Sequence, residues 1–181
     1  MSSSRVLLVE DEPGYARFLR EVLLEAEEES YVPVWVDTLE AAIRYLNTEK
    51  FEIVLLDLGL PDADGTEALA RVSERAPETP IVVLSALNDL DVAIESMRLG
   101  AQEYLVKGQA EHLLLPRAIR YAVERMRLQA RVVAARAEAE RANSVKDDFL
   151  AMLGHELRNP LAPILTALNV LERKEHSGIR R

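Results

Sequence analysis

Five short apolar runs, separated by amphipathic stretches, constrain the fold of this chain more than any other feature of its sequence. The runs are rich in branched side chains and mostly lack polar alternation, and they lie at residues 6–9, 32–36, 53–56, 81–84 and 104–106. Strands that are buried on both faces, as in a parallel sheet covered by helices, have this pattern. Pro33 fits an edge strand or the start of a strand, because proline cannot donate a hydrogen bond to a neighbouring strand.

The stretches between the runs have helical periodicity. They lie at residues 15–28, 39–46, 66–75 and 89–99, and helix-entry signals such as Pro13 and Asp37-Thr38 precede two of them. Gly100 follows the last stretch and is expected to be its C-cap. This strand–helix alternation predicts an α/β, doubly wound, five-stranded parallel sheet, whose binding crevice lies at the carboxyl ends of the strands.

After Gly108 the sequence changes to a long helical pattern. Residues 111–143 contain no glycine, and their single proline, Pro116, stands near the start, where a helix tolerates it. Apolar residues there alternate spacings of four and three in an alanine-rich heptad seam, formed by Ile119, Val123, Met126, Ala130, Val133 and Ala137. We therefore expect a sheet domain at 1–110, a long helix and coiled-coil linker at 111–145, and a second helical segment at 146–181.

Charge and composition narrow the class of protein. Residues 1–116 carry 9 basic and 23 acidic side chains, whereas residues 117–181 carry 13 and 8. An acidic front and a mildly basic rear indicate either two modules or only the solvated face of a basic helix. Because no helix-turn-helix pattern follows, we expect no nucleic-acid binding. No apolar run approaches the roughly 18 residues of a membrane span, so we expect a cytoplasmic protein without membrane contact. Cysteine is absent, which excludes disulfides and thiolate metal sites.

Polar side chains stand at the ends of four of the runs, where the strands converge on the crevice. They are Glu10 and Asp11, Asp57, Ser85 and Lys107. Three gathered carboxylates repel one another, and a hard cation such as Mg²⁺ offsets that repulsion. An ammonium and a hydroxyl opposite them would bind phosphoryl oxygens, which suits phosphoryl transfer to Asp57 as the nucleophile. Each residue alone would be read as a cap or a surface residue; the set is hard to explain by capping.

The motifs around these residues identify a family. Val-Glu10-Asp11-Glu12, Leu-Leu-Asp57-Leu-Gly-Leu-Pro61-Asp62, Ser85-Ala86 and Tyr104-Leu-Val-Lys107 resemble the receiver domain of two-component response regulators over residues 5–125. The resemblance implies a flavodoxin-like fold with Asp57 as the phosphorylation site. It also implies that Asp11 and Asp57 bind Mg²⁺ directly, Glu10 through water and Gly59 through its carbonyl.

The same resemblance assigns the remaining residues of the receiver. Ser85 and Lys107 would contact the phosphoryl group, and Tyr104 would be the aromatic switch residue that turns inward as Ser85 moves. Gly108 departs from the family, since a proline often follows the lysine, and this departure puts the pose of Lys107 in question.

A second motif lies in the rear segment. Residues 149–161 resemble the phosphoacceptor box of histidine kinases, and His155 and Asn159 stand four apart on one helical face. The resemblance implies that His155 accepts phosphate from ATP, that Glu156 is its general base and that Asn159 positions later phosphotransfer. Pro160 would break an ordinary helix, but the family pattern predicts one kinked helix.

Together these motifs predict the front part of a receiver–histidine kinase hybrid. No glycine-rich nucleotide motif is present, so we expect no autokinase activity from this chain alone and an ATP-binding domain downstream or in trans. Expected partners are a cognate histidine kinase or phosphotransfer protein, and a second copy bound through the helical segments. The alternatives are a non-catalytic dimerising adaptor with an idle His155, and, less favoured, a DNA-binding regulator.

Overall fold

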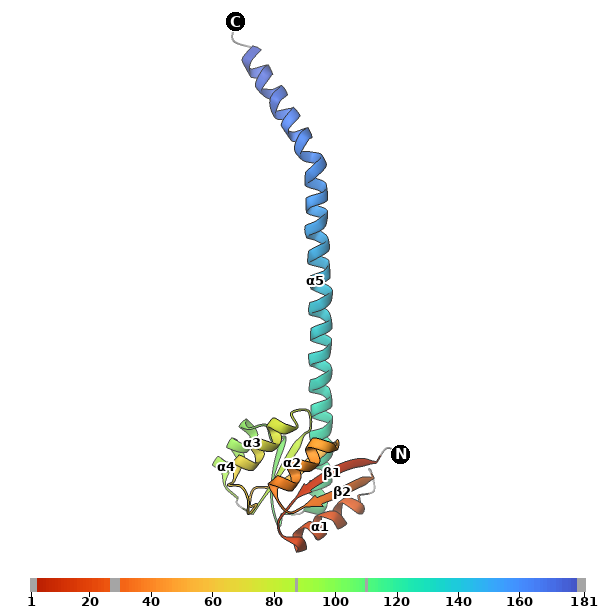
Figure 1. The fold of residues 1–181 in the computed structure, drawn as a ribbon, viewed down its shortest axis with the longest axis vertical. Coiled ribbons are helices and arrows are strands. Elements are labelled where there is room, and N and C mark those ends of the chain that lie inside the picture. The colour runs from red at the N-terminus through yellow and green to blue at the C-terminus, as the bar shows by residue number, and fades with distance from the viewer. Residues whose placement is uncertain (1–2, 27–29, 87, 110, 179–181) are drawn as a thin grey trace. The chain divides into compact units, whose positions relative to one another are not determined.

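The computed structural model of this chain places five strands where the apolar runs predict them (Figure 1). They are β1 Ser4–Val9, β2 Tyr31–Val36, β3 Ile53–Asp57, β4 Ile81–Ser85 and β5 Glu103–Val106. All neighbouring strands are parallel and their order is β2-β1-β3-β4-β5. Pro33 lies on the edge strand β2, opposite Val6 of β1. The predicted five-stranded parallel sheet is confirmed.

The structure describes residues 3–26, 30–86, 88–109 and 111–178, and the side chains of these residues except at 111, 151 and 154–178. The chain divides into two units, Met1–Ala130 and Arg131–Arg181. The first contains the sheet and its helices, and the described part of the second, residues 131–178, is helical.

Four helices connect the strands: α1 Pro13–Leu24, α2 Leu39–Thr48, α3 Thr66–Arg75 and α4 Leu90–Arg98. The helix expected to reach residue 28 ends at Leu24, with Glu25 as its C-cap. An acidic run begins there, and negative charge at a helix C-terminus opposes the helix dipole. Thr38 and Asp89 cap α2 and α4 by accepting hydrogen bonds from backbone N–H groups of the first turns. Gly100 follows α4 at a φ of +104°, as expected of a C-cap glycine.

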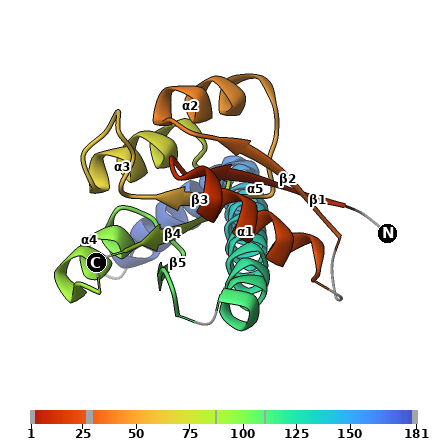
Figure 2. The ribbon, with the colours of Figure 1, turned by 90° about the horizontal axis from the view of Figure 1, so that it is seen from below.

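The sheet is buried on both faces by two separate hydrophobic clusters. Helices α2 and α3 cover one face of the sheet, and α1 and the start of α5 cover the other (Figure 2). Leu7, Val54 and Val83 belong to the cluster with α2 and α3, and Leu8, Leu55 and Val82 belong to the cluster with α1 and α5. These six strand residues are 0% exposed. Continuous apolar strands are explained by this two-sided burial, and polar side chains are therefore confined to the strand ends.

The last helix, α5 Glu111–Gly178, joins the two helical segments that the sequence analysis expected to be distinct. Nothing between them breaks a helix, and Asn143 donates a side-chain hydrogen bond of 3.3 Å to Asp147 one turn later. The helix continues past Pro160, in agreement with the family pattern rather than with the breaker rule. Among the described residues, no helix is long and apolar enough to cross a membrane.

The predicted heptad seam begins on residues that the receiver-like unit uses for its own core. Ile119 is 1% exposed within the cluster beneath α1, and Val123 packs against the same cluster. Another apolar row of α5 is exposed instead, formed by Leu114, Tyr121 and Leu128 at intervals of seven residues. Ile119, the first position of the predicted seam, is therefore buried in the core of its own unit, and Val123, the second, is partly buried there, while pairing through the seam stays a prediction.

Candidate functional site

The polar residues predicted from the strand ends meet at the carboxyl edge of the sheet. Glu10 and Asp11 follow β1, and Asp57 ends the adjacent strand β3. One carboxylate oxygen from each lies within 4.8 Å of the others. Strand order reverses between β1 and β3, and a doubly wound sheet opens its binding crevice at such a point. The predicted gathering of these three carboxylates is confirmed.

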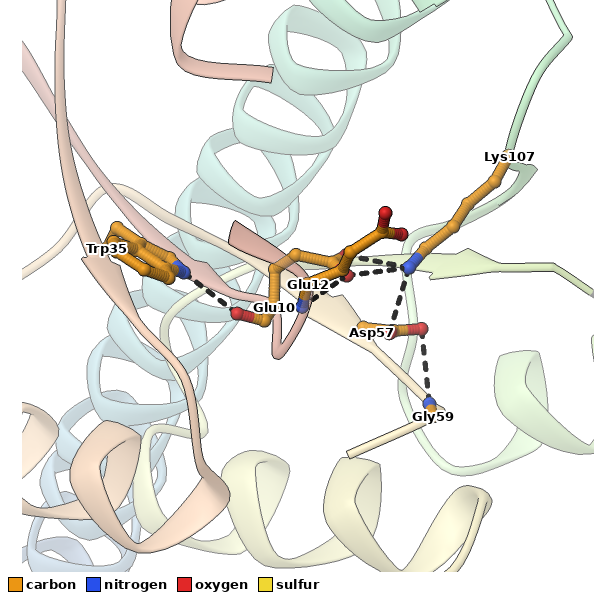
Figure 3. Close-up of polar contacts among 6 residues, drawn as sticks. All are labelled: Glu10, Glu12, Trp35, Asp57, Gly59 and Lys107. Carbon is orange, nitrogen blue, oxygen red and sulfur yellow. Dashed lines mark hydrogen bonds and ion pairs between the residues drawn. The ribbon is translucent and has the colours of Figure 1, made fainter. Parts of the chain in front are cut away.

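Lys107 crosses from the end of β5 to two of these carboxylates (Figure 3). Its Nζ donates to both oxygens of Glu10, at 2.9 and 2.7 Å, and to Oδ2 of Asp57 at 2.8 Å. The side chain of Glu10 is fully buried and that of Lys107 is 16% exposed. The ammonium of Lys107 is therefore shared between the two carboxylates and joins Glu10 to Asp57.

Burial and pairing shift the pKa values of this group. Burial raises the pKa of Glu10, and the hydrogen bond from Lys107 opposes that rise without cancelling it, while the charge of Asp57 adds to it. Burial opposes the charge of Lys107, but its hydrogen bonds to Asp57 and Glu10 outweigh burial and raise the pKa of the ammonium. Lys107 is therefore a cation at neutral pH.

The backbone at Gly108 does not suit the proline that often follows this lysine in the family that the sequence resembles. Its φ is +82°, in the left-handed region. Proline is fixed near a φ of about −65°, so the local backbone seen here could not accommodate it. Even so, Lys107 reaches the carboxylates, and its backbone N–H donates to the carbonyl of Ser85 at 2.8 Å.

Gly59 shapes the space around Asp57. Its N–H donates to Oδ1 of Asp57 at 3.1 Å, which orients the carboxylate. A Cβ at this position would lie 3.3 Å from Oδ2 of Asp57, a closer approach than nearly all real contacts of that kind. The glycine therefore allows the loop after β3 to pass close to the carboxylate.

Asp57 opens into a pocket of about 470 Å³ whose lining also includes Gly59, Ser85 and Lys107. Ser85 is 4% exposed at the end of β4 and shares this lining. Tyr104, on β5, is half-buried and packs against the cluster beneath α2 and α3. The switch role of Ser85 and Tyr104 stays a prediction. The side chains of His155, Glu156 and Asn159 lie outside the described residues.

The sequence analysis missed Trp35, which supports the acidic loop. Its indole Nε1 donates to the backbone carbonyl of Glu10 at 2.8 Å (Figure 3). Trp35 lies on β2, and it is the single tryptophan of the chain. No local pattern reveals this contact, because it depends on β2 lying beside β1 in register.

Asp62 appeared in the sequence analysis only as part of a motif, yet it connects the loop after β3 with the start of α2. Its carboxylate oxygens accept hydrogen bonds of 2.9 Å from the backbone N–H groups of Leu39 and Glu40, the first residues of α2. Burial is the largest single influence on the pKa of Asp62 and raises it, but the backbone hydrogen bonds together outweigh burial and lower that pKa. The loop after β3, which carries Gly59, is thereby fastened to the start of α2.

The donor set fits Mg²⁺. Three carboxylates converge, each offering one oxygen to a common point, and hard oxygen ligands are those that Mg²⁺ prefers. Asp11 is exposed, so a cation held there would keep water ligands as well. Glu10, Asp11 and Asp57 would hold the ion, while the predicted contribution of the Gly59 carbonyl remains a prediction.

Comparison with protein families finds two matches in this chain. The family described as "Response regulator receiver domain" matches residues 6–119. The family described as "His Kinase A (phospho-acceptor) domain" matches residues 145–180. The two matches follow the same order as the two predicted motifs.

Similar proteins agree with the first match. The response regulator protein FleR of Pseudomonas aeruginosa is 36% identical over 121 residues, which are 67% of this chain and 25% of FleR. A signal receiver domain of a putative LuxO repressor from Vibrio parahaemolyticus has a TM-score of 0.63 and 26% identity, covering 72% of this chain and 98% of that one. The Mn²⁺-bound form of response regulator Rcp1 has a TM-score of 0.54 and 28% identity, covering 64% of this chain and 89% of Rcp1. The chain spans less than half the length of the first curated relatives that it matches.

The bond from Trp35 generates a prediction about metal affinity. Trp35→Phe keeps an aromatic ring but removes the donor to Glu10, and a net hydrogen bond contributes roughly 1 kcal/mol, or about fivefold in affinity. We expect the Kd for Mg²⁺, measured by calorimetry, to rise about two- to fivefold. Val32→Ala, which trims an exposed side chain on the same strand, should leave the Kd unchanged. Equal affinities for Trp35→Phe and the parent protein would contradict this supporting role.

Proposed function

This chain belongs to the response regulator receiver domain family, and we propose that Asp57 is its phosphoacceptor in a Mg²⁺-dependent reaction. A receiver domain and a His kinase A phospho-acceptor domain in one chain make it a component of two-component signalling. The observation that carries the proposal is the position of the Asp57 carboxylate, beside Glu10 and Asp11 and in contact with Lys107.

The reaction is nucleophilic substitution at phosphorus. An oxygen of Asp57 attacks the phosphorus of a phosphodonor, the bond from phosphorus to the donor breaks, and the donor leaves with the bonding electron pair. The product is an acyl phosphate on Asp57. Asp57 is only 4% exposed but opens into the pocket, so a donor reaches it from one side.

Lys107 and Ser85 would bind the transferred group. Once Asp57 carries the phosphoryl group, the negative charge lies on the phosphoryl oxygens, and the Lys107 ammonium gains more by donating to them than to the acyl oxygens of Asp57. The Ser85 hydroxyl offers a second donor from the end of β4. When bound, Mg²⁺ supplies positive charge that offsets the carboxylates and the incoming phosphoryl group.

The proposal extends to the rear of the chain. Phosphorylation of Asp57 would regulate, through α5, a phosphoacceptor segment in which His155 takes phosphate, Glu156 acts as base and Asn159 positions the reaction. Residues 145–180 match the His kinase A family, which supports this assignment. The phosphoryl group of Asp57 would come from a cognate histidine kinase or phosphotransfer protein in the cytoplasm. An ATP-binding domain would transfer a phosphoryl group from ATP to His155.

We also propose that two copies pair through α5. In the first unit, Leu114, Tyr121 and Leu128 are 43%, 58% and 50% exposed at heptad spacing. In the second unit, Val145, Phe149 and Met152 are each more than half exposed, at spacings of four and three. Exposed apolar rows with this repeat are typical of coiled-coil contacts.

Replacing Asp57 tests the phosphoacceptor. With acetyl phosphate and Mg²⁺, the parent protein should take up one base-labile phosphoryl group, and Asp57→Asn should take up none, because the amide is not a nucleophile. Asp37→Asn, which changes an exposed carboxylate after the edge strand β2, should react as the parent does. Intact-mass measurement follows the added phosphate, and uptake by Asp57→Asn at the parent's rate would refute the assignment.

A kinase ATP-binding domain supplied in trans separates the proposed function from an adaptor with an idle His155. We expect acid-labile phosphate on His155 when ATP is present, and none in His155→Gln. His176→Gln keeps the candidate acceptor and should be labelled normally. Absence of label in the parent protein, with a domain that labels its own substrate, would favour the adaptor.

A carboxylate introduced into the exposed apolar row of α5 tests the proposed pairing of two copies. Leu128→Asp should raise the dimer dissociation constant at least about tenfold, since an unpaired carboxylate would be enclosed in the contact. Gln129→Asp adds the same charge at the neighbouring position and should change it little. Sedimentation equilibrium measures both, and equal effects of the two substitutions would contradict pairing through this row.

A further inference from the structure

Three aromatic rings connect Lys107 with the first turn of α5. The Nζ atom of Lys107 lies 4.6 Å from the centre of the Tyr15 ring and over its face. The ring centres of Tyr15 and Phe18 are 5.8 Å apart, and those of Phe18 and His112 are 5.5 Å apart at an angle of 81°. Tyr15 and Phe18 belong to α1, and His112 belongs to α5.

The Tyr15 ring is a further contact of the ammonium, in addition to its two carboxylate partners. Lys107 donates hydrogen bonds to Glu10 and Asp57 and lies over the face of this ring. With its side chain 16% exposed, the lysine has lost most of its water, and a cation is attracted to an aromatic face more strongly when it is desolvated. Tyr15 is itself half-buried, so its position is set by packing rather than by solvent.

From this geometry we infer that Tyr15 is a positioning residue for Lys107. Its ring holds the ammonium at the carboxylate cluster, and the rings of Phe18 and His112 keep Tyr15 in place. The lysine is thereby ready to move its hydrogen bonds from the carboxylates to a phosphoryl group without first leaving for solvent. The inference rests on the proposed function, since it concerns the residue that would bind the phosphoryl group.

If Tyr15 positions Lys107, its removal should slow phosphorylation without weakening Mg²⁺ binding. Tyr15→Leu keeps an apolar side chain but removes the ring, so the ammonium becomes more mobile and more hydrated. The maximal rate of phosphorylation by acetyl phosphate, at saturating Mg²⁺ and donor, should fall about three- to thirtyfold, the range that cation–π contacts span between partly exposed and desolvated sites. The Kd for Mg²⁺ should stay equal or decrease, because the ammonium competes less strongly for Glu10 and Asp57.

A measurement without metal or donor checks the same contact. In the metal-free protein, an amine-reactive acetylating reagent should modify Lys107 several-fold faster in Tyr15→Leu than in the parent, as followed by peptide mass spectrometry. Tyr15→Phe retains the ring face and should behave as the parent does in all three measurements. Phe18→Leu should shift them in the same directions by smaller factors, and it serves as the second variant should Tyr15→Leu fail to fold.

The chain contains a matched control far from the site. Arg5 lies 4.9 Å from the ring centre of Phe51, and Phe51 contacts the ring of Tyr45 at 6.4 Å. Tyr45→Leu therefore removes a ring from a similar cation and aromatic arrangement, and it should change neither the phosphorylation rate nor the labelling of Lys107.

Three results would overturn the inference. The first is Tyr15→Leu with the parent's rate, metal affinity and labelling. The second is a slower rate together with weaker Mg²⁺ binding, which indicates general loosening of the loop. The third is a Tyr15→Phe variant as impaired as Tyr15→Leu, which assigns the effect to the hydroxyl. If the parent protein itself takes up no phosphate, the proposed function fails instead, whereas the Lys107 labelling still tests the contact.

Discussion

The ion pairs of Lys107 with Glu10 and Asp57 are the interaction on which the rest of the site depends. Three neighbouring carboxylates, of which Glu10 and Asp57 are buried, would repel one another, and Glu10 has no exposed surface through which water could compensate. The ammonium offsets this repulsion and places a cation beside Asp57, the proposed nucleophile. Under the proposed function the same lysine is held firmly and also exchanges partners, and its surroundings combine carboxylates, an aromatic ring and a glycine in the left-handed region.

The parallel sheet delivers these groups to one place. Each strand ends at the same edge, so a polar residue at the end of β1, β3, β4 or β5 needs no special loop to reach the crevice. The supporting contacts come from elements further away. Trp35 on β2 holds the carbonyl of Glu10, and Asp62 fastens the loop of Gly59 to α2. Function thus rests on residues that are not themselves at strand ends.

Much of this arrangement could be predicted from the sequence, for a physical reason. Burial on both faces leaves a strand no freedom to carry polar residues except at its end, so Glu10, Asp57 and Ser85 were visible as interruptions. Trp35 and Tyr15 were not, because their partners are distant in sequence and their residue types are ordinary in a core. The heptad seam on α5 could not be interpreted fully for a related reason. Periodicity places Ile119 on an apolar face of the helix, but it does not show whether the sheet or another helix covers that face.

The two edges of the sheet carry a consequence for behaviour at high concentration. An open strand edge can recruit an identical strand from another molecule and begin aggregation. Here β5 is only four residues long, and Pro33 interrupts the six residues of β2 with a position that has no N–H to offer. Neither border is a good template for fibril growth, so self-association through backbone ladders is disfavoured, and contacts between copies are left to side chains.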